Sequence, residues 1–172
     1  MPNHCENDLY IYGDEEIRNK FVESCKVLDD KNEEIRIFHT QFPCPQELQD
    51  TTATILTNRD ENPELWDKWE DNKEKYGAKD WYDWCNKYWG TKWGDYNNYV
   101  LQHDEYRTHI EFSSAWSPPL KGLMEVSRKW PDLEFNIEYF EQGMGFAGGD
   151  KFVNGELTEL WYTEEYHGNR GG

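Results

Sequence analysis

Apolar and polar residues alternate in several stretches of this chain, and a period of two predicts β-strands with one buried face. The clearest stretch is residues 133–140, where Leu133, Phe135, Ile137 and Tyr139 occupy every second position. Other strands are predicted at residues 9–12, 34–42 and 107–116, with a less regular extended segment at 91–101.

Helical spacing follows the first predicted strand. Asp14 is a suitable N-cap because its carboxylate can accept hydrogen bonds from the first turn of a helix. Apolar residues then recur at helical spacing and predict the buried face of this helix: Ile17, Phe21, Cys25 and Leu28. The charged segment 29–34 predicts a turn before the second strand.

The middle of the chain predicts a helical segment between two groups of strands. Asn62 followed by Pro63 is typical of a helix start, and Gly77 predicts the end of that helix. A shorter helix is predicted at residues 80–88, ended by Gly90. The preceding residues, 46–60, have no clear period and are expected to form a loop or a weak short element.

The C-terminal third predicts one more helix and a β-hairpin. Ser117 is the expected N-cap of a helix that ends at Pro131, and the predicted buried face comprises Leu120, Leu123, Met124, Ser127 and Trp130. A glycine-rich turn is expected at 143–149. The final strands, 151–153 and 156–163, are expected to form a hairpin around Asn154-Gly155.

This order of elements predicts an α+β fold. We expect a ferredoxin-like antiparallel sheet with two helices on one face, a Trp-rich helical insertion at about residues 62–90, and a C-terminal β-hairpin. Residues 1–163 are expected to form a single domain, with 164–172 as a flexible tail.

The composition favours a core built from a few large side chains. Aromatic residues make up 16% of the chain although the hydrophobic fraction is only 36%. The formal net charge is −17, from 35 acidic and 18 basic residues. Such a surface is unsuited to duplex DNA and to anionic membranes, because both attract cationic proteins. It suits a partner with a basic surface.

The four cysteines, at positions 5, 25, 44 and 85, are too widely spaced to indicate a zinc motif or a dense disulfide framework. The N-terminal residues contain no basic region and no apolar run, so no signal peptide is expected. We therefore expect a cytoplasmic protein with reduced thiols and no cofactor.

The most unusual stretch runs from Trp81 to Tyr99 and contains four of the nine tryptophans and four of the eleven tyrosines. One interpretation is that these rings pack the insertion onto the sheet. The other is that they line a slot in which a nucleobase stacks and a lysine meets its phosphate. The candidate ligand-binding residues are Asn86, Trp89, Lys92, Trp93, Trp116 and Glu141.

Five segments occur in an order that resembles a known family. They are Pro2-Asn3-His4-Cys5-Glu6-Asn7, Phe42-Pro43-Cys44-Pro45-Gln46-Glu47-Leu48, Tyr88-Trp89-Gly90-Thr91-Lys92-Trp93, Ala115-Trp116-Ser117-Pro118-Pro119 and Tyr139-Phe140-Glu141-Gln142-Gly143-Met144-Gly145-Phe146-Ala147-Gly148. Together they resemble the phage and plasmid family that carries a YubB-type ferredoxin-like domain. This resemblance implies a fold and a mobile-element origin, and it supplies no catalytic mechanism.

Two further sets of residues have types suited to chemistry. One is a set of carboxylates: Glu138, Glu141 and Asp150. Acid–base catalysis needs carboxylates whose pKa values are separated by burial, and Glu138 belongs to the polar face of its strand, so a solvated face is the simpler interpretation. The other set contains metal-ligand types: His4, Cys5, His39 and Cys44. Their spacing matches no known ligand pattern, so no metal is expected.

These observations favour a non-enzymatic phage or mobile-element accessory protein. We expect it to bind a host protein through its acidic surface and to act as a counter-defence inhibitor. The alternative is a small-ligand binder that sequesters a signalling nucleotide in a Trp-lined pocket. A hydrolase that uses the carboxylates is a third hypothesis, and no catalytic residue is assigned.

Overall fold

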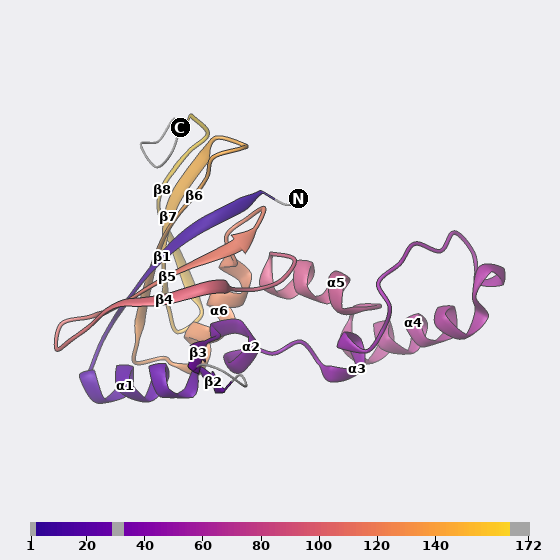
Figure 1. Cartoon of the computed structure of the whole chain (residues 1–172), viewed down its shortest axis with the longest axis horizontal. Coiled ribbons are helices and arrows are strands. Elements are labelled where there is room, and N and C mark those ends of the chain that lie inside the picture. Colours follow the sequence, from indigo (N-terminus) through magenta and orange to yellow (C-terminus); the bar gives the residue numbers. More distant parts are fainter. Residues whose placement is uncertain (1–2, 29–32, 166–172) are drawn as a thin grey trace.

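The computed structural model describes residues 3–28 and 33–165. Its centre is a six-stranded antiparallel sheet in the order β4-β5-β1-β6-β7-β8 (Figure 1). The strands are β1 (His4–Tyr12), β4 (Tyr96–His103), β5 (Thr108–Ala115), β6 (Glu134–Glu141), β7 (Phe146–Val153) and β8 (Glu156–Thr163). The order β4-β5-β1-β6, with a helix after β1 and another after β5, is the ferredoxin-like arrangement, so the predicted fold class is confirmed.

Two helices cover one face of this sheet, as predicted: α1 (Glu15–Ser24) and α6 (Leu120–Lys129). Asp14 caps α1 by accepting hydrogen bonds from the N–H groups of Glu16 and Ile17. The ring of Phe21 in α1 packs edge-on against Phe135 of β6, with 5.4 Å between centroids. The inward side chains of the central strands are fully buried beneath these helices, including Leu9, Ile11, Ile110 and Ile137.

A helical insertion separates the β1–α1 unit from β4. It contains α3 (Gln46–Gln49), the 3-10 turn η1 (Arg59–Glu61), α4 (Pro63–Tyr76), α5 (Trp81–Trp84) and the π-helix η2 (Cys85–Trp89). Figure 1 shows α4 extending well away from the sheet. The predicted limits of α4 are confirmed, because Asn62 accepts a hydrogen bond from Leu65 N–H and Gly77 is left-handed with φ 71°. The prediction of a loop or a weak short element at 46–60 is confirmed, since this segment holds the four-residue α3 and the start of η1 and otherwise has no helix or strand.

The strand predicted at 34–42 is wrong. Only Glu33–Ile35 is extended, as β3, and it pairs with the short β2 (Lys26–Leu28). Residues Ile37–Gln41 instead form the helix α2. The physical reason is a distant cap: the carboxylate of Asp95 accepts hydrogen bonds from the first N–H groups of α2, and no local pattern reveals that partner.

The end of the first predicted helix also differs. The helix stops at Ser24, and Leu28 belongs to β2 with 89% of its surface exposed. Cys25 is fully buried, as expected. The predicted turn at 29–34 falls partly outside the described residues, and Glu33 and Glu34 belong to β3.

Two other local predictions need correction. Ser117 does not cap α6; its hydroxyl donates to the carbonyl oxygen of Gly90 at 2.6 Å and so ties the start of α6 to the insertion. The glycine-rich turn ends before Phe146, and Gly148 and Gly149 lie inside β7. A Cβ at either glycine would collide with a ring, because the Tyr139 hydroxyl and the Trp161 indole occupy that space.

The C-terminal hairpin is confirmed, and its turn uses Asn154 and Gly155 with φ 49° and 79°. Most of the tail predicted from residue 164 lies outside the described residues. Within the described ranges, no helix is long and apolar enough to cross a membrane.

Leucine-to-alanine substitutions test this arrangement. Leu123 is fully buried in α6, so Leu123→Ala is expected to lower the free energy of unfolding by about 2–5 kcal/mol. Leu28→Ala removes an exposed side chain and should change it by less than about 0.5 kcal/mol. Denaturant unfolding followed by tryptophan fluorescence measures both, and equal losses would contradict the placement of Leu28.

Candidate functional site

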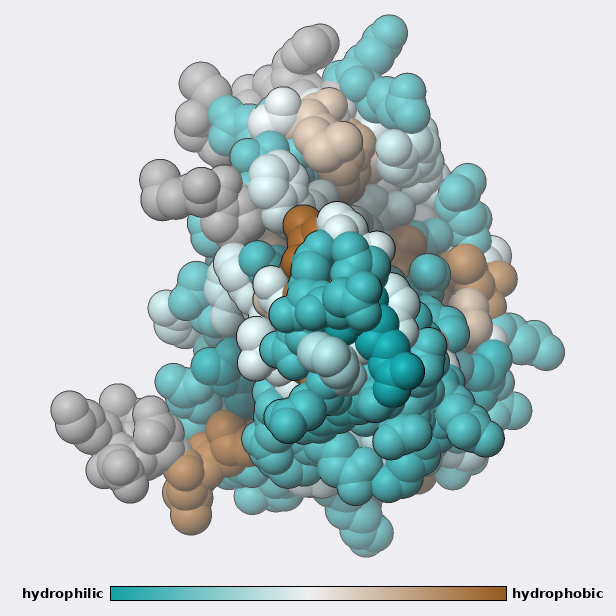
Figure 2. Space-filling model, turned by 90° about the vertical axis from the view of Figure 1, so that its right-hand side faces the viewer, coloured by the Kyte–Doolittle hydropathy of each residue, from teal (hydrophilic) through white to brown (hydrophobic). Residues whose placement is uncertain are grey.

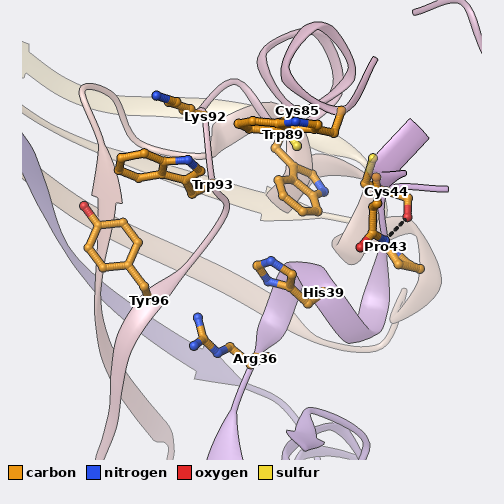
Figure 3. Close-up of a pocket in the computed structure, with 11 residues that line it drawn as sticks. Arg36, His39, Pro43, Cys44, Cys85, Trp89, Lys92, Trp93 and Tyr96 are labelled. Carbon is orange, nitrogen blue, oxygen red and sulfur yellow. Dashed lines mark hydrogen bonds between the residues drawn. The ribbon is translucent and has the colours of Figure 1, made fainter. Parts of the chain in front are cut away.

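A pocket of about 550 Å³ lies where the insertion meets α2 and the first residues of β4 (Figure 3). This volume is within the range of small-molecule sites. Its lining residues are Arg36, His39, Pro43, Cys44, Gln49, Trp81, Cys85, Trp89, Lys92, Trp93 and Tyr96. They come from four segments of the chain, so the pocket exists only in the folded protein.

The aromatic residues of the insertion divide between packing and lining the pocket. Trp84 and Trp89 are buried, and Trp89 is only 2% exposed. Its indole N–H donates to the carbonyl oxygen of Phe42 at 2.8 Å, which fixes the ring. Trp93, in contrast, is 38% exposed. Figure 3 shows Trp93 and Tyr96 on the opposite side of the pocket from Trp89. The two interpretations of the tryptophan-rich stretch therefore apply to different rings.

The ionisable nitrogen-bearing side chains in the pocket wall are Arg36, His39 and Lys92, and no lining residue is Asp or Glu. Lys92 Nζ lies 4.4 Å from the centroid of the Trp93 ring. Among the described residues, no carboxylate lies within 4 Å of it. Arg36 is paired with Glu34: its Nε donates to that carboxylate at 3.1 Å, and its Nη2 lies 3.1 Å from the same oxygen. Lys92 therefore presents an unpaired ammonium at the pocket, whereas Arg36 is paired with Glu34 and His39 lies beside the Asp95 carboxylate.

The buried carboxylate of Asp95 positions the cationic side of the pocket. Asp95 accepts hydrogen bonds from Ile37 N–H at 2.7 Å and Phe38 N–H at 2.9 Å. Its own carbonyl oxygen accepts from Arg36 Nη1 at 2.9 Å. His39 Nδ1 lies 3.6 Å from the same carboxylate. These contacts hold Arg36 and His39 at the edge of the pocket.

The ionisation of Asp95 follows from this environment. Burial alone would raise its pKa, because a low-dielectric interior disfavours charge. The interactions with His39, Phe38 N–H, Asn98 and Ile37 N–H together outweigh burial and hold the pKa of Asp95 below its ordinary value. The group is therefore an anion at neutral pH, and it stabilises the N-terminus of α2.

Tyr96 closes the sheet side of the pocket. Its hydroxyl lies 2.8 Å from His4 Nδ1, so a residue of β1 orients the ring. Burial, with Glu6 and Cys5 nearby, raises the pKa of Tyr96 to about 12. The phenol is therefore neutral at physiological pH, and it presents a ring and a hydroxyl but no charge.

Three of the predicted ligand-binding residues line the pocket: Trp89, Lys92 and Trp93. The other three are not among its lining residues. Asn86 is exposed in η2 and donates to the carbonyl oxygen of Tyr82. Trp116 follows β5 in a left-handed conformation with φ 71°. Glu141 is buried and accepts hydrogen bonds from Gly143 N–H and Met144 N–H, so it caps the turn between β6 and β7.

The carboxylate set does not assemble. Glu138 and Glu141 lie three positions apart on β6, so their side chains point to opposite faces of the sheet. Asp150 is buried on β7 opposite Ile137. Burial raises the pKa of Asp150, and the nearby Glu159 adds to that effect. No shared acid–base site results.

The potential metal ligands are also dispersed. His4 and Cys5 are neighbours on β1 and therefore face opposite sides of the sheet, whereas His39 and Cys44 lie at the pocket. Within the residues described, no group of three or more potential ligands converges.

Sequence reasoning missed several lining residues, above all Arg36, His39 and Tyr96. Arg36 and His39 were predicted to lie on a strand, and Tyr96 was assigned only to an extended segment. The one signal that could have indicated them is Asp95, an acidic residue next to an aromatic strand. Its role is visible only when α2 is placed beside it.

Comparisons with known proteins agree with this fold. Residues 95–170, somewhat less than half of the chain, match the family described as "Ferredoxin-like domain in Api92-like protein". The crystal structure of protein api92 from Yersinia pseudotuberculosis aligns with 94% of this chain and 99% of its own, with a TM-score of 0.55 and 13% sequence identity. At that identity the likeness concerns the fold alone. No curated protein matches this sequence.

Asp95→Asn tests the role of the buried carboxylate. An amide accepts fewer hydrogen bonds than a carboxylate and carries no charge. At pH 7 the free energy of unfolding of the variant should therefore be about 2–4 kcal/mol lower than that of the wild type. Because the folded-state pKa of Asp95 is depressed, this contribution is complete above the unfolded pKa of about 4 and is lost as pH falls through the folded pKa. The difference between wild type and variant should therefore shrink below about pH 4.

The matched control is Asp71→Asn, which neutralises an exposed carboxylate on α4. It should change the free energy of unfolding by less than about 0.5 kcal/mol. Urea titrations at several pH values measure the free energy of unfolding of the wild type, Asp95→Asn and Asp71→Asn. A loss for Asp95→Asn that matches the control would show that the carboxylate does not hold α2.

Proposed function

We propose that this chain binds a small anionic molecule that carries a planar ring, and that nucleotides are the class of ligand that fits the pocket. The observation that carries the proposal is the composition of the pocket wall. It contains Arg36, His39 and Lys92 beside four aromatic rings and contains no carboxylate, although acids outnumber bases 35 to 18 in the chain.

The chemistry of these side chains supports that class. Exposed indole faces stack on nucleobases with about 1–3 kcal/mol per base. Lys92 supplies a point charge for a phosphate group, whereas the guanidinium of Arg36 is already bonded to the Glu34 carboxylate and to the carbonyl oxygen of Asp95. Lys92 and Trp93 are adjacent in sequence and in contact in space, so a ring stacked on Trp93 would leave its phosphate within reach of a cation.

The acidic remainder of the surface is compatible with an anionic ligand. Charges more than about 8 Å apart are largely screened at physiological ionic strength. Carboxylates beyond that distance therefore contribute little to the field at the ligand, and the nearby ones, Glu34 and Asp95, lie beside Arg36 and His39 rather than beside Lys92. The remote carboxylates slow the approach of anions but do not contact them.

Nucleotide titration tests the proposal. We expect quenching of tryptophan fluorescence by at least one member of a panel of nucleoside phosphates and cyclic nucleotides. Lys92→Ala should weaken that binding about 10-fold or more, because a charged hydrogen bond contributes about 1.5–3 kcal/mol. Trp93→Ala should also weaken it, through the loss of stacking.

Lys68→Ala is the control, since Lys68 is an exposed lysine on α4 outside the pocket. It should leave the affinity unchanged, and the corresponding nucleoside without phosphate should bind more weakly than the nucleotide. Absence of quenching across the panel, or equal losses in Lys68→Ala and Lys92→Ala, would refute nucleotide binding in this pocket.

A second candidate function is the binding of a basic host protein, as expected for a counter-defence inhibitor from a phage or plasmid. The observation in its favour is the shape and charge of the insertion. Glu64, Asp71 and Glu74 are exposed on one side of α4, and Figure 2, which views the molecule from the insertion end, shows a predominantly hydrophilic face. The resemblance to the YubB-type phage and plasmid family supports this candidate because it implies a mobile-element origin.

Charge neutralisation on α4 separates the two candidates. A triple variant with Glu64→Gln, Asp71→Asn and Glu74→Gln should lose a partner that the wild type retains from bacterial lysate at low salt. Lys92→Ala should retain that partner, since its substitution lies in the pocket. Recovery of the same proteins by the wild type and the triple variant would count against an acidic docking surface on α4.

A further inference from the structure

The charged groups around the pocket are nearly balanced. Two nitrogens of Arg36 contact one oxygen of the Glu34 carboxylate, each at 3.1 Å. His39 Nδ1 lies 3.6 Å from the fully buried carboxylate of Asp95. Neither pair contributes net positive charge, so Lys92 remains as the one cation without a counter-charge among the described lining residues.

Several neutral donors of the pocket are already engaged. The indole N–H of Trp89 donates to the carbonyl oxygen of Phe42. The side-chain amide of Gln49 donates to the carbonyl oxygen of Cys44 at 2.7 Å. The first N–H groups of α2 donate to the Asp95 carboxylate. These donors are therefore not free to hold the additional oxygens of a second phosphate group.

Phosphate groups differ in the charge that they bring to such a site. A phosphodiester carries one negative charge, as each link of a nucleic acid does. A phosphomonoester carries about −1.5 to −2 at pH 7, because its second pKa is about 6, and each further phosphate adds to the total. Magnesium ions that accompany polyphosphates are usually held through one or two carboxylates, and none of the described lining residues is Asp or Glu. The single ammonium of Lys92 therefore matches the charge of a phosphodiester.

We propose that this pocket selects nucleotides whose phosphate is a diester, such as cyclic mononucleotides, over the monophosphate and triphosphate of the same nucleoside. This selectivity rests on the proposed function, because it defines the class of nucleotide for the same pocket. Figure 3 shows Lys92 and Arg36 on opposite sides of the cavity. A phosphate beside Lys92 therefore meets one opposite charge, whereas a second negative charge directed toward Arg36 meets Glu34.

Titration with matched nucleotides tests the selectivity. For each of the common bases, the 3′,5′-cyclic monophosphate, the 5′-monophosphate and the 5′-triphosphate are added at neutral pH without divalent cations, and tryptophan fluorescence reports binding. For the base that binds best, we expect the cyclic form to bind about 3- to 5-fold more tightly than the other two, which is the effect of about one partly exposed ion pair.

The pH dependence separates the charge of the ligand from its shape. Below about pH 6 a monophosphate takes up a proton and carries about one negative charge. Its affinity should therefore approach that of the cyclic form as the pH falls. The cyclic form, measured in parallel, accounts for protonation of His39 over the same range.

Glu34→Gln should weaken the selectivity. This substitution removes the counter-charge of Arg36, so the affinity for the 5′-monophosphate should rise about 3- to 5-fold relative to the cyclic form. Glu33→Gln is the matched control, because it removes the same charge from the neighbouring residue of β3, which pairs with Lys26 and does not line the pocket. It should leave the ratio of the two affinities unchanged.

The outcomes keep the selectivity and the proposed function apart. A triphosphate that binds as tightly as the cyclic form would overturn the selectivity and leave the proposed function standing. Equal changes of the ratio in Glu34→Gln and Glu33→Gln would do the same. If no nucleotide of the set binds, the proposed function fails and the selectivity fails with it.

Discussion

The fully buried carboxylate of Asp95 links the parts of this molecule that matter most for binding. It lies just before β4 and accepts hydrogen bonds from the first N–H groups of α2. These bonds stabilise a helix in a stretch whose residues alternate as in a strand. The same residue holds Arg36 through its backbone oxygen and lies beside His39. Transfer of a charged group from water to the protein interior is costly unless hydrogen bonds satisfy the charge. Hydrogen bonds satisfy the carboxylate of Asp95, and the same contacts position the residues on this side of the pocket.

The tryptophan-rich stretch has two physical roles in one segment. Trp84 and Trp89 pack against Phe42 and Phe38 and join the insertion to the sheet domain. Trp93 stays partly exposed, in contact with Lys92. Packing supplies the rigid wall, and the exposed ring with its cation supplies a surface for recognition.

Predictions from local pattern succeeded where a short segment carries its own signal. The alternation at 133–140 predicted β6, the Asn62-Pro63 start and Gly77 predicted α4, and Asn154-Gly155 predicted the last turn. They failed where distant groups decide the outcome. The strand predicted at 34–42 became α2, and two glycines expected in a turn became part of β7. The first difference follows from the Asp95 cap, and the second from the pairing of β7 with β6 and β8.

Local sequence patterns were enough to predict the α+β class, the position of the insertion, the acidic character of the chain, and three of the residues that line the pocket. These features follow from periodicity, caps and composition, which act over a few residues. The folded structure was needed to show which rings are buried and which cationic side chains share a cavity. Those properties depend on contacts between segments far apart in the chain, and burial and proximity of this kind have no signature in local spacing.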